Sequence, residues 1–147
     1  MRSWLLLILV SAIAISGFAG EADLEATHRE LTEMNRLEQE AFAAGRCEEL
    51  LDLLAEDISF YANGRPMTKE AVGAFCERIP RPLPGSGEQE TRVRAVSPDA
   101  GYVIKTMTFP GTSRVEVVTK IWSRGVDGWK LEHFHSTVTD LQASPSQ

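Results

Sequence analysis

The stretch that decides the fold is residues 118–136, which read VTKIWSRGVDGWKLEHFHS. Two runs rich in β-branched and aromatic residues flank Gly125-Val126-Asp127-Gly128, and this composition is typical of a tight turn between antiparallel strands. The sequence therefore predicts a hairpin made of strands 113–124 and 129–139.

Two more strands precede this hairpin, over residues 90–96 and 102–109, with turn residues between them and Pro110-Gly111 after them. Together the four strands predict an antiparallel meander. The N-terminal half reads differently, with apolar residues at helical spacing over 22–44, 48–55 and 69–79. A chain whose helices come first and whose strands follow is typical of the α+β class.

Residues that favour helix ends and turns separate these N-terminal elements. Gly45 ends the first helix, and Thr68 is a suitable N-cap for the third. A short strand over 58–61 leads into Asn63-Gly64, which predicts a tight turn. Residues 80–87 are rich in proline and glycine and predict a long irregular loop, a candidate rim or lid.

The N-terminus predicts export. Arg2 is followed by an uncharged apolar run and by Gly17-Phe18-Ala19, the three parts of a secretory signal. We expect a signal peptide over 1–19, cleaved after Ala19, then one domain over 20–141 and a disordered tail over 142–147. The apolar run is shorter than the ~20 residues that cross a bilayer. The protein is therefore expected to be secreted or periplasmic.

The net charge argues against some classes of binding partner, and the cysteine content predicts a disulfide. The 147-residue chain has a formal net charge of −6 and no cluster of lysine and arginine, which argues against nucleic acid and, after signal cleavage, against membrane surfaces. Its two cysteines, Cys47 and Cys76, predict one disulfide in an oxidising compartment. The alternative is two buried thiols that never meet.

Strand alternation in 129–139 gives candidate pocket residues. Trp129 and Leu131 share one face with His133 and His135, so this face is expected to leave the core and become the wall of a wet cavity. The alternative is that both histidines are satisfied by neighbouring backbone or threonine groups. Two histidines at this spacing supply too few ligands for zinc, so we predict no metal and no cofactor.

The tyrosines and the preceding strand leave alternatives open. Tyr61 and Tyr102 have hydroxyls that could donate to a ligand carbonyl, or they are ordinary half-buried strand residues. Asp57 could act as a base beside Tyr61, or lie at the surface. In strand 113–124, Val115, Val117 and Ile121 form the plainly apolar face. The other face carries Glu116, Val118, Lys120 and Trp122. Its charged residues are either a solvated face or, with Trp122, a dimer surface.

Residues 43–60, AAGRCEELLDLLAEDISF, and residues 118–136 resemble the nuclear transport factor 2-like (NTF2-like) superfamily. More narrowly, they resemble its SnoaL-like and domain-of-unknown-function 4440 group. The resemblance implies a cone: a curved antiparallel sheet wrapped around about three helices, with a pocket at the open end. It also implies a homodimer through the convex sheet face. The superfamily contains isomerases, dehydratases, cyclases and assembly domains, so the fold does not fix the function.

Three functional hypotheses follow. The first is an exported, non-catalytic domain that binds a small, partly apolar ligand against Tyr61, Tyr102, His133 and His135. The second is an isomerase, dehydratase or cyclase that moves protons on a hydrophobic carbonyl compound, which requires the pocket's acid–base groups to converge. The third is a partner-binding or assembly module, which an exposed apolar patch around Trp122 and Phe134 would favour. No catalytic residue is assigned.

Overall fold

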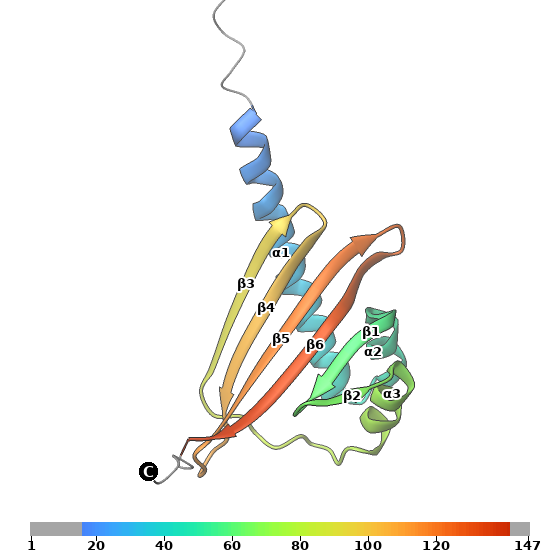
Figure 1. Cartoon of the computed structure of the whole chain (residues 1–147), viewed down its shortest axis with the longest axis vertical. Coiled ribbons are helices and arrows are strands. Elements are labelled where there is room, and N and C mark those ends of the chain that lie inside the picture. The colour runs from blue at the N-terminus through green and yellow to red at the C-terminus, as the bar shows by residue number, and fades with distance from the viewer. Residues whose placement is uncertain (1–15, 142–147) are drawn as a thin grey trace, which may run out of the picture.

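The computed structural model of the protein describes residues 16–141, so the predicted tail and most of the predicted signal lie outside the described residues. The described residues form three helices and one six-stranded sheet (Figure 1). The helices are α1 (Ser16–Ala44), α2 (Cys47–Leu53) and α3 (Lys69–Arg78). The strands are β1 (Leu54–Ala62), β2 (Arg65–Met67), β3 (Gln89–Ser97), β4 (Ala100–Thr108), β5 (Arg114–Gly125) and β6 (Gly128–Asp140).

The strand order in the sheet is β2-β1-β6-β5-β4-β3. The antiparallel meander of β3 to β6 is the one predicted, and β1 adds to it in parallel beside β6. In Figure 1, α1 crosses behind the long strands, while α2 and α3 gather beside β1 and β2. The predicted α+β class, a curved sheet wrapped around helices, is confirmed.

The N-terminal elements begin and end close to where the sequence predicts. The N–H of Gly45, in the left-handed conformation, donates to Phe42 O, and the N–H of Arg46 donates to Ala41 O, which closes α1 with a Schellman motif. The Thr68 hydroxyl accepts from the N–H of Ala71 and caps α3.

The boundary between α2 and β1 differs from the prediction. Leu54 and Ala55 belong to the strand, not to the helix, because Leu54 pairs with Leu131 of β6 and both are buried. Strand pairing thus outweighs the helical spacing of the leucines. After the predicted turn at Asn63-Gly64 the chain also forms β2, a short edge strand where Pro66 is tolerated.

The core lies between α1 and the inner face of the sheet. Trp122 and Val103 are fully buried there, so the expected assignment of the two faces of β5 was wrong: Val118, Lys120 and Trp122 point inward, and Val117 and Ile121 are exposed. Both faces carry apolar residues, so alternation alone did not identify the inner one. The buried position of Trp122 also removes it from any dimer surface.

A β-bulge in β6 reverses the alternation of that strand. Trp122 pairs with Leu131, but the adjacent Ile121 pairs with His133, so Glu132 is an extra residue. Before the bulge, Leu131 faces the core; after it, Phe134 takes the inner face beside Lys120. The histidines that follow Leu131 therefore turn outward.

The contact between α1 and the sheet depends on Gly101, which pairs with Trp122. A Cβ added there would lie 2.2 Å from Leu31 Cδ1 and 2.5 Å from the Arg94 carbonyl oxygen. Only glycine therefore lets α1 approach the sheet this closely.

We expect Gly101→Ala to lower the free energy of unfolding by about 1–3 kcal/mol, because the helix or the backbone of β3 must shift. Gly85→Ala is the matched control, since a Cβ at Gly85 has no atom within 4 Å. Urea unfolding measures both variants. Equal stability of the two would show that the close approach of α1 is not a constraint.

Candidate functional site

A cavity of about 450 Å³ lies between the inner face of the sheet and the three helices. The helices contribute a wall of apolar side chains from α1, α2, α3 and the residue directly after α3: Phe42, Leu50, Val72, Phe75 and Ile79. The strands contribute the facing wall: Leu54, Phe60, Met67 and Phe134. Its volume is in the range of small-molecule sites, and its lining is mainly apolar, as such sites are.

The aromatic residues of the two walls form pairs. Phe60 of β1 stacks on Phe134 of β6, with ring centroids 4.2 Å apart and planes within 9°. Phe42 of α1 stacks on Phe75 of α3 at 6.1 Å. Phe75 is 44% exposed, so the helix pair marks the side on which the cavity meets solvent.

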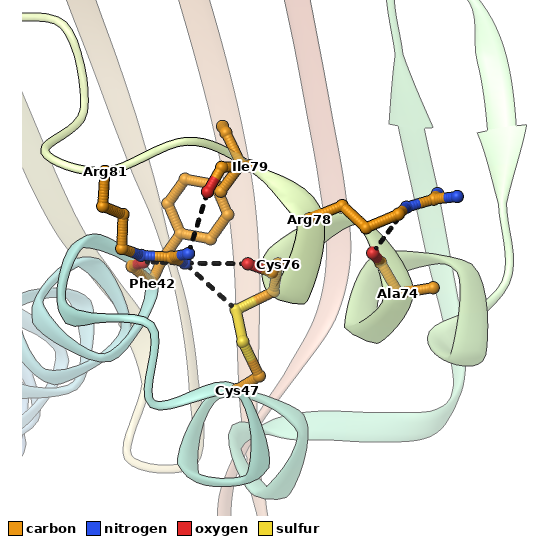
Figure 2. The surroundings of a disulfide bond; sticks show 7 residues. All are labelled: Phe42, Cys47, Ala74, Cys76, Arg78, Ile79 and Arg81. Atoms are coloured by element: carbon orange, nitrogen blue, oxygen red, sulfur yellow. Dashed lines mark hydrogen bonds between the residues drawn. A yellow bond between two sulfur atoms is a disulfide. The ribbon is translucent and has the colours of Figure 1, made fainter.

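The helix wall is held by the Cys47–Cys76 disulfide, which joins α2 to α3 and confirms the predicted pairing. Arg81 reinforces it (Figure 2). Its guanidinium donates to the carbonyl oxygens of Phe42 and Cys76 at 2.9 Å and of Ile79 at 3.1 Å. One cation therefore binds carbonyls at the C-terminal ends of α1 and α3, where helix dipoles favour positive charge. A disulfide of this kind is compatible with an exported protein.

One end of the cavity is polar. Glu38 of α1, Glu116 of β5 and Ser136 of β6 line it together with Asn63 of the β1–β2 turn. The Ser136 hydroxyl donates to Glu116 Oε1 at 2.5 Å. Asn63 Oδ1 accepts from the N–H of Val138 at 2.8 Å, which fixes this rim to β6.

Behind this end lies a buried ion pair. Lys120 is 3% exposed, and its Nζ donates to Glu38 Oε2 and, at 3.1 Å, to Asn35 Oδ1. Asn35 and Glu38 are themselves buried on α1, so the helix contributes polar groups to a stripe that was expected to be apolar. Every charge here has a partner, as burial requires.

A second lysine lies beside the pair. Lys105 Nζ donates to Gln39 Oε1 at 2.7 Å. Burial and the nearby charge of Lys120 lower the pKa of Lys105, while Glu38 and Glu116 act in the opposite direction. The polar end of the cavity thus has two glutamates in its lining, and two lysines that do not line the cavity lie close to them.

The four predicted pocket residues lie elsewhere. Tyr61, His133 and His135 lie on the outer face of the sheet, which faces away from the described helices, and Tyr102 lies on the same face because it pairs with Ile121. None of them lines the cavity. The bulge at Glu132 explains why the two histidines lie on the outer face, because it reverses the alternation on which the expectation depended.

On the outer face these side chains contact one another. The Tyr61 and His135 rings are 6.3 Å apart, as are those of His133 and His135. His133 Nδ1 lies 3.3 Å from Ser59 Oγ, and His135 Nε2 lies 3.3 Å from Thr137 Oγ1. The alternative of backbone or threonine partners therefore agrees with the contact of His135, whereas His133 contacts a serine.

Asp57 is exposed and does not line the cavity. The base and donor expected from Asp57, Tyr61, His133 and His135 therefore do not converge on one enclosed point. Glu38 and Glu116, which do line the cavity, were not predicted as site residues. The one available signal was charge at positions 116 and 120 of an otherwise apolar strand.

Within residues 16–141, no group of three or more histidine, cysteine, aspartate or glutamate residues is arranged to hold a metal ion. No helix in that same range combines the length and hydropathy that a transmembrane span requires.

Solved structures with the same architecture decide what the fold is. A protein of unknown function from Pectobacterium atrosepticum, of the DUF3225 family, superposes with a TM-score of 0.66 at 16% identity, over 76% of this chain and 90% of that chain. An NTF2-like protein from Cytophaga hutchinsonii gives 0.62 at 17% identity, over 76% and 97%. The fold is NTF2-like. An NTF2-like protein from Rhodospirillum rubrum, described as of unknown function in nutrient uptake, gives 0.54 at 24% identity, over 74% and 98%.

At these identities the likeness to NTF2-like structures is one of fold. No protein-family model matches the sequence, and no curated protein matches it significantly. The predicted superfamily resemblance is confirmed at the level of fold, and the narrower SnoaL-like and domain-of-unknown-function 4440 assignment stays a prediction.

We predict that the buried Lys120–Glu38 pair stabilises the fold. Lys120→Met leaves the Glu38 carboxylate buried without its cation, so we expect the free energy of unfolding to fall by about 3–5 kcal/mol. Replacing both partners, Glu38→Leu with Lys120→Met, is expected to cost much less. Denaturant unfolding measures these changes.

The control is Arg46→Met, which breaks the exposed Arg46–Glu49 pair and is expected to cost less than about 1 kcal/mol. If Lys120→Met cost no more than this control, the buried pair would not be a stabilising link between α1 and the sheet.

Proposed function

We propose that the protein is an exported domain that binds a small, partly apolar molecule in the cavity between the sheet and its helices. The observation that carries this proposal is the cavity's asymmetry: stacked phenylalanines on two walls and two carboxylates with a hydroxyl at one end. Such a lining buries an apolar body and orients it through a few polar contacts.

A binding role is favoured over catalysis by what the cavity presents. Its lining, drawn from the described residues, contains no histidine, tyrosine or cysteine. The acid–base groups of the isomerase-type alternative lie on the outer face or are exposed, too far from the cavity to move protons on a bound carbonyl compound. Export is supported by the apolar N-terminal run and by the disulfide.

The binding proposal is tested with Nile red, an uncharged dye that fluoresces in apolar surroundings. Ala62 lines the cavity, and Ala62→Trp fills part of it, so we expect the dye's affinity to fall by at least about tenfold, a loss of about 1.4 kcal/mol. Fluorescence titration measures the affinity.

Ala74→Trp is the matched control, because Ala74 is exposed on α3 and does not line the cavity. If the native protein did not bind the dye, or if both tryptophan variants bound it as the native protein does, the cavity would not be a ligand site.

A homodimer through the outer sheet face is the partner we propose. Val117, Ile121 and Tyr61 are each about 40% exposed on this face, at 42%, 43% and 39%. Exposed apolar side chains on one sheet face, here interspersed with His133, His135 and Thr119, are typical of an interface. Phe134, expected in this patch, instead lines the cavity.

The dimer is tested with Ile121→Glu. A two-fold interface would bury two such carboxylates, so we expect the variant to sediment as a monomer at concentrations where the native protein is a dimer. Val126→Glu is the control, since Val126 is fully exposed in the β5–β6 turn. A native protein that sediments as a monomer at all accessible concentrations would contradict the proposal.

A further inference from the structure

The charges at the polar end of the cavity indicate which class of molecule fits it. We propose that the ligand is a small amphiphilic amine, whose protonated nitrogen binds Glu116 and whose apolar body lies between the Phe60–Phe134 wall and the Phe42–Phe75 wall. This inference rests on the proposed function, because it requires that the cavity binds a small molecule.

The ionic side chains that line the cavity are carboxylates. Glu38 and Glu116 line it, whereas Lys105 and Lys120 do not. The amine of Lys120 is held by Glu38 and Asn35, and that of Lys105 by Gln39. A ligand in the cavity therefore meets acceptor oxygens, and its polar group must donate.

Glu116 is the carboxylate that lacks a contact cation. Glu38 has the ammonium of Lys120, but no lysine, arginine or histidine nitrogen in the described part of the chain forms an ion pair with Glu116, and Lys105 interacts with it only from beyond contact distance. Its one hydrogen-bond donor there is the Ser136 hydroxyl. A half-buried carboxylate with a single neutral donor has capacity for a charged one, and such charge-assisted bonds are about twice as strong as neutral ones.

The aromatic wall suits the apolar body of such a ligand. Phe60 stacks on Phe134 and Lys120 Nζ lies 6.0 Å from the Phe134 ring centroid, so both faces of this ring are occupied and the cavity meets ring edges. Phe134 lines the cavity, as does Phe60, on which it stacks. An ammonium at Glu116 would leave the attached apolar body within reach of these rings.

Other polar groups fit this end less well. An alcohol donates a hydrogen bond to Glu116 but carries no charge. A carboxylate would meet the oxygens of Glu38 and Glu116 at the lining, while the ammonium groups of Lys105 and Lys120 are already held by Gln39, Glu38 and Asn35. For ligands of one shape, the expected order of affinity is therefore amine, then alcohol, then carboxylate.

The test measures three ligands that share one apolar body: 4-phenylbutylamine, 4-phenylbutan-1-ol and 4-phenylbutyrate. Calorimetric titration of the disulfide-bonded protein at neutral pH is expected to give an affinity for the amine about tenfold or more above that for the alcohol, and weakest binding of the acid. Glu116→Gln keeps an acceptor for Ser136 but removes the charge, so it should lower amine affinity by about tenfold and leave alcohol affinity nearly unchanged.

Glu132→Gln is a matched control. Glu132 accepts from the Ser123 hydroxyl at 2.5 Å, as Glu116 accepts from Ser136, but it does not line the cavity. This variant should keep the native preference. If circular dichroism showed that Glu116→Gln is unfolded, the order of the three ligand affinities measured with the native protein would decide alone.

The outcomes separate the two proposals. If Nile red binds in the cavity but the amine is not preferred over the alcohol, or if Glu132→Gln loses the preference as fully as Glu116→Gln, the amine inference is overturned and the binding function stands. If neither the dye nor any of the three ligands binds, both are overturned.

Discussion

The ion pair of Lys120 and Glu38 is the interaction on which the arrangement of this protein depends. It joins the C-terminal part of α1 to the middle of β5, inside the core, where an unpaired charge would cost several kcal/mol. Because Lys120 must meet Glu38, the inner face of β5 and the rotation of α1 are fixed together. The same pair gives the cavity its polar end. Because Glu38 also lines the cavity, the pair contributes a carboxylate to an otherwise mainly apolar lining.

Two kinds of local irregularity then decide which residues face the cavity. The bulge at Glu132 lets the start of β6 pack Leu131 against the core and still places Phe134 on the inner wall. Gly101 lets α1 lie close to the sheet beside Trp122, which closes the other end of the core. On the opposite side, the Cys47–Cys76 disulfide and Arg81 hold together the helices that carry the aromatic wall. The cavity therefore has covalent and electrostatic support around an apolar lining.

The candidate site was the part that sequence reasoning located least well. Alternation along β6 placed His133 and His135 on the face of Leu131, and one inserted residue reversed this. Alternation along β5 offered two faces that each carry apolar residues, and only the contact with α1 distinguishes them. Glu116 looked like a solvated residue for the same reason. Its neighbour Ser136, on the next strand, comes into contact through strand register, which a single sequence does not specify.

The sequence by itself determined the elements and their order: an amphipathic first helix ended by Gly45, a third helix capped by Thr68, a turn at Asn63-Gly64 and four long strands that form a meander. These depend on local rules of periodicity, capping and turn chemistry, which act over a few residues. It also predicted the Cys47–Cys76 disulfide, because two cysteines allow one pairing. Only the tertiary structure decided that β1 lies parallel beside β6, that Trp122 is buried, and that Glu38, Glu116 and Ser136 meet at one end of a cavity. These depend on which distant surfaces pack together, and there the burial of charge and aromatic surface outweighs local preference.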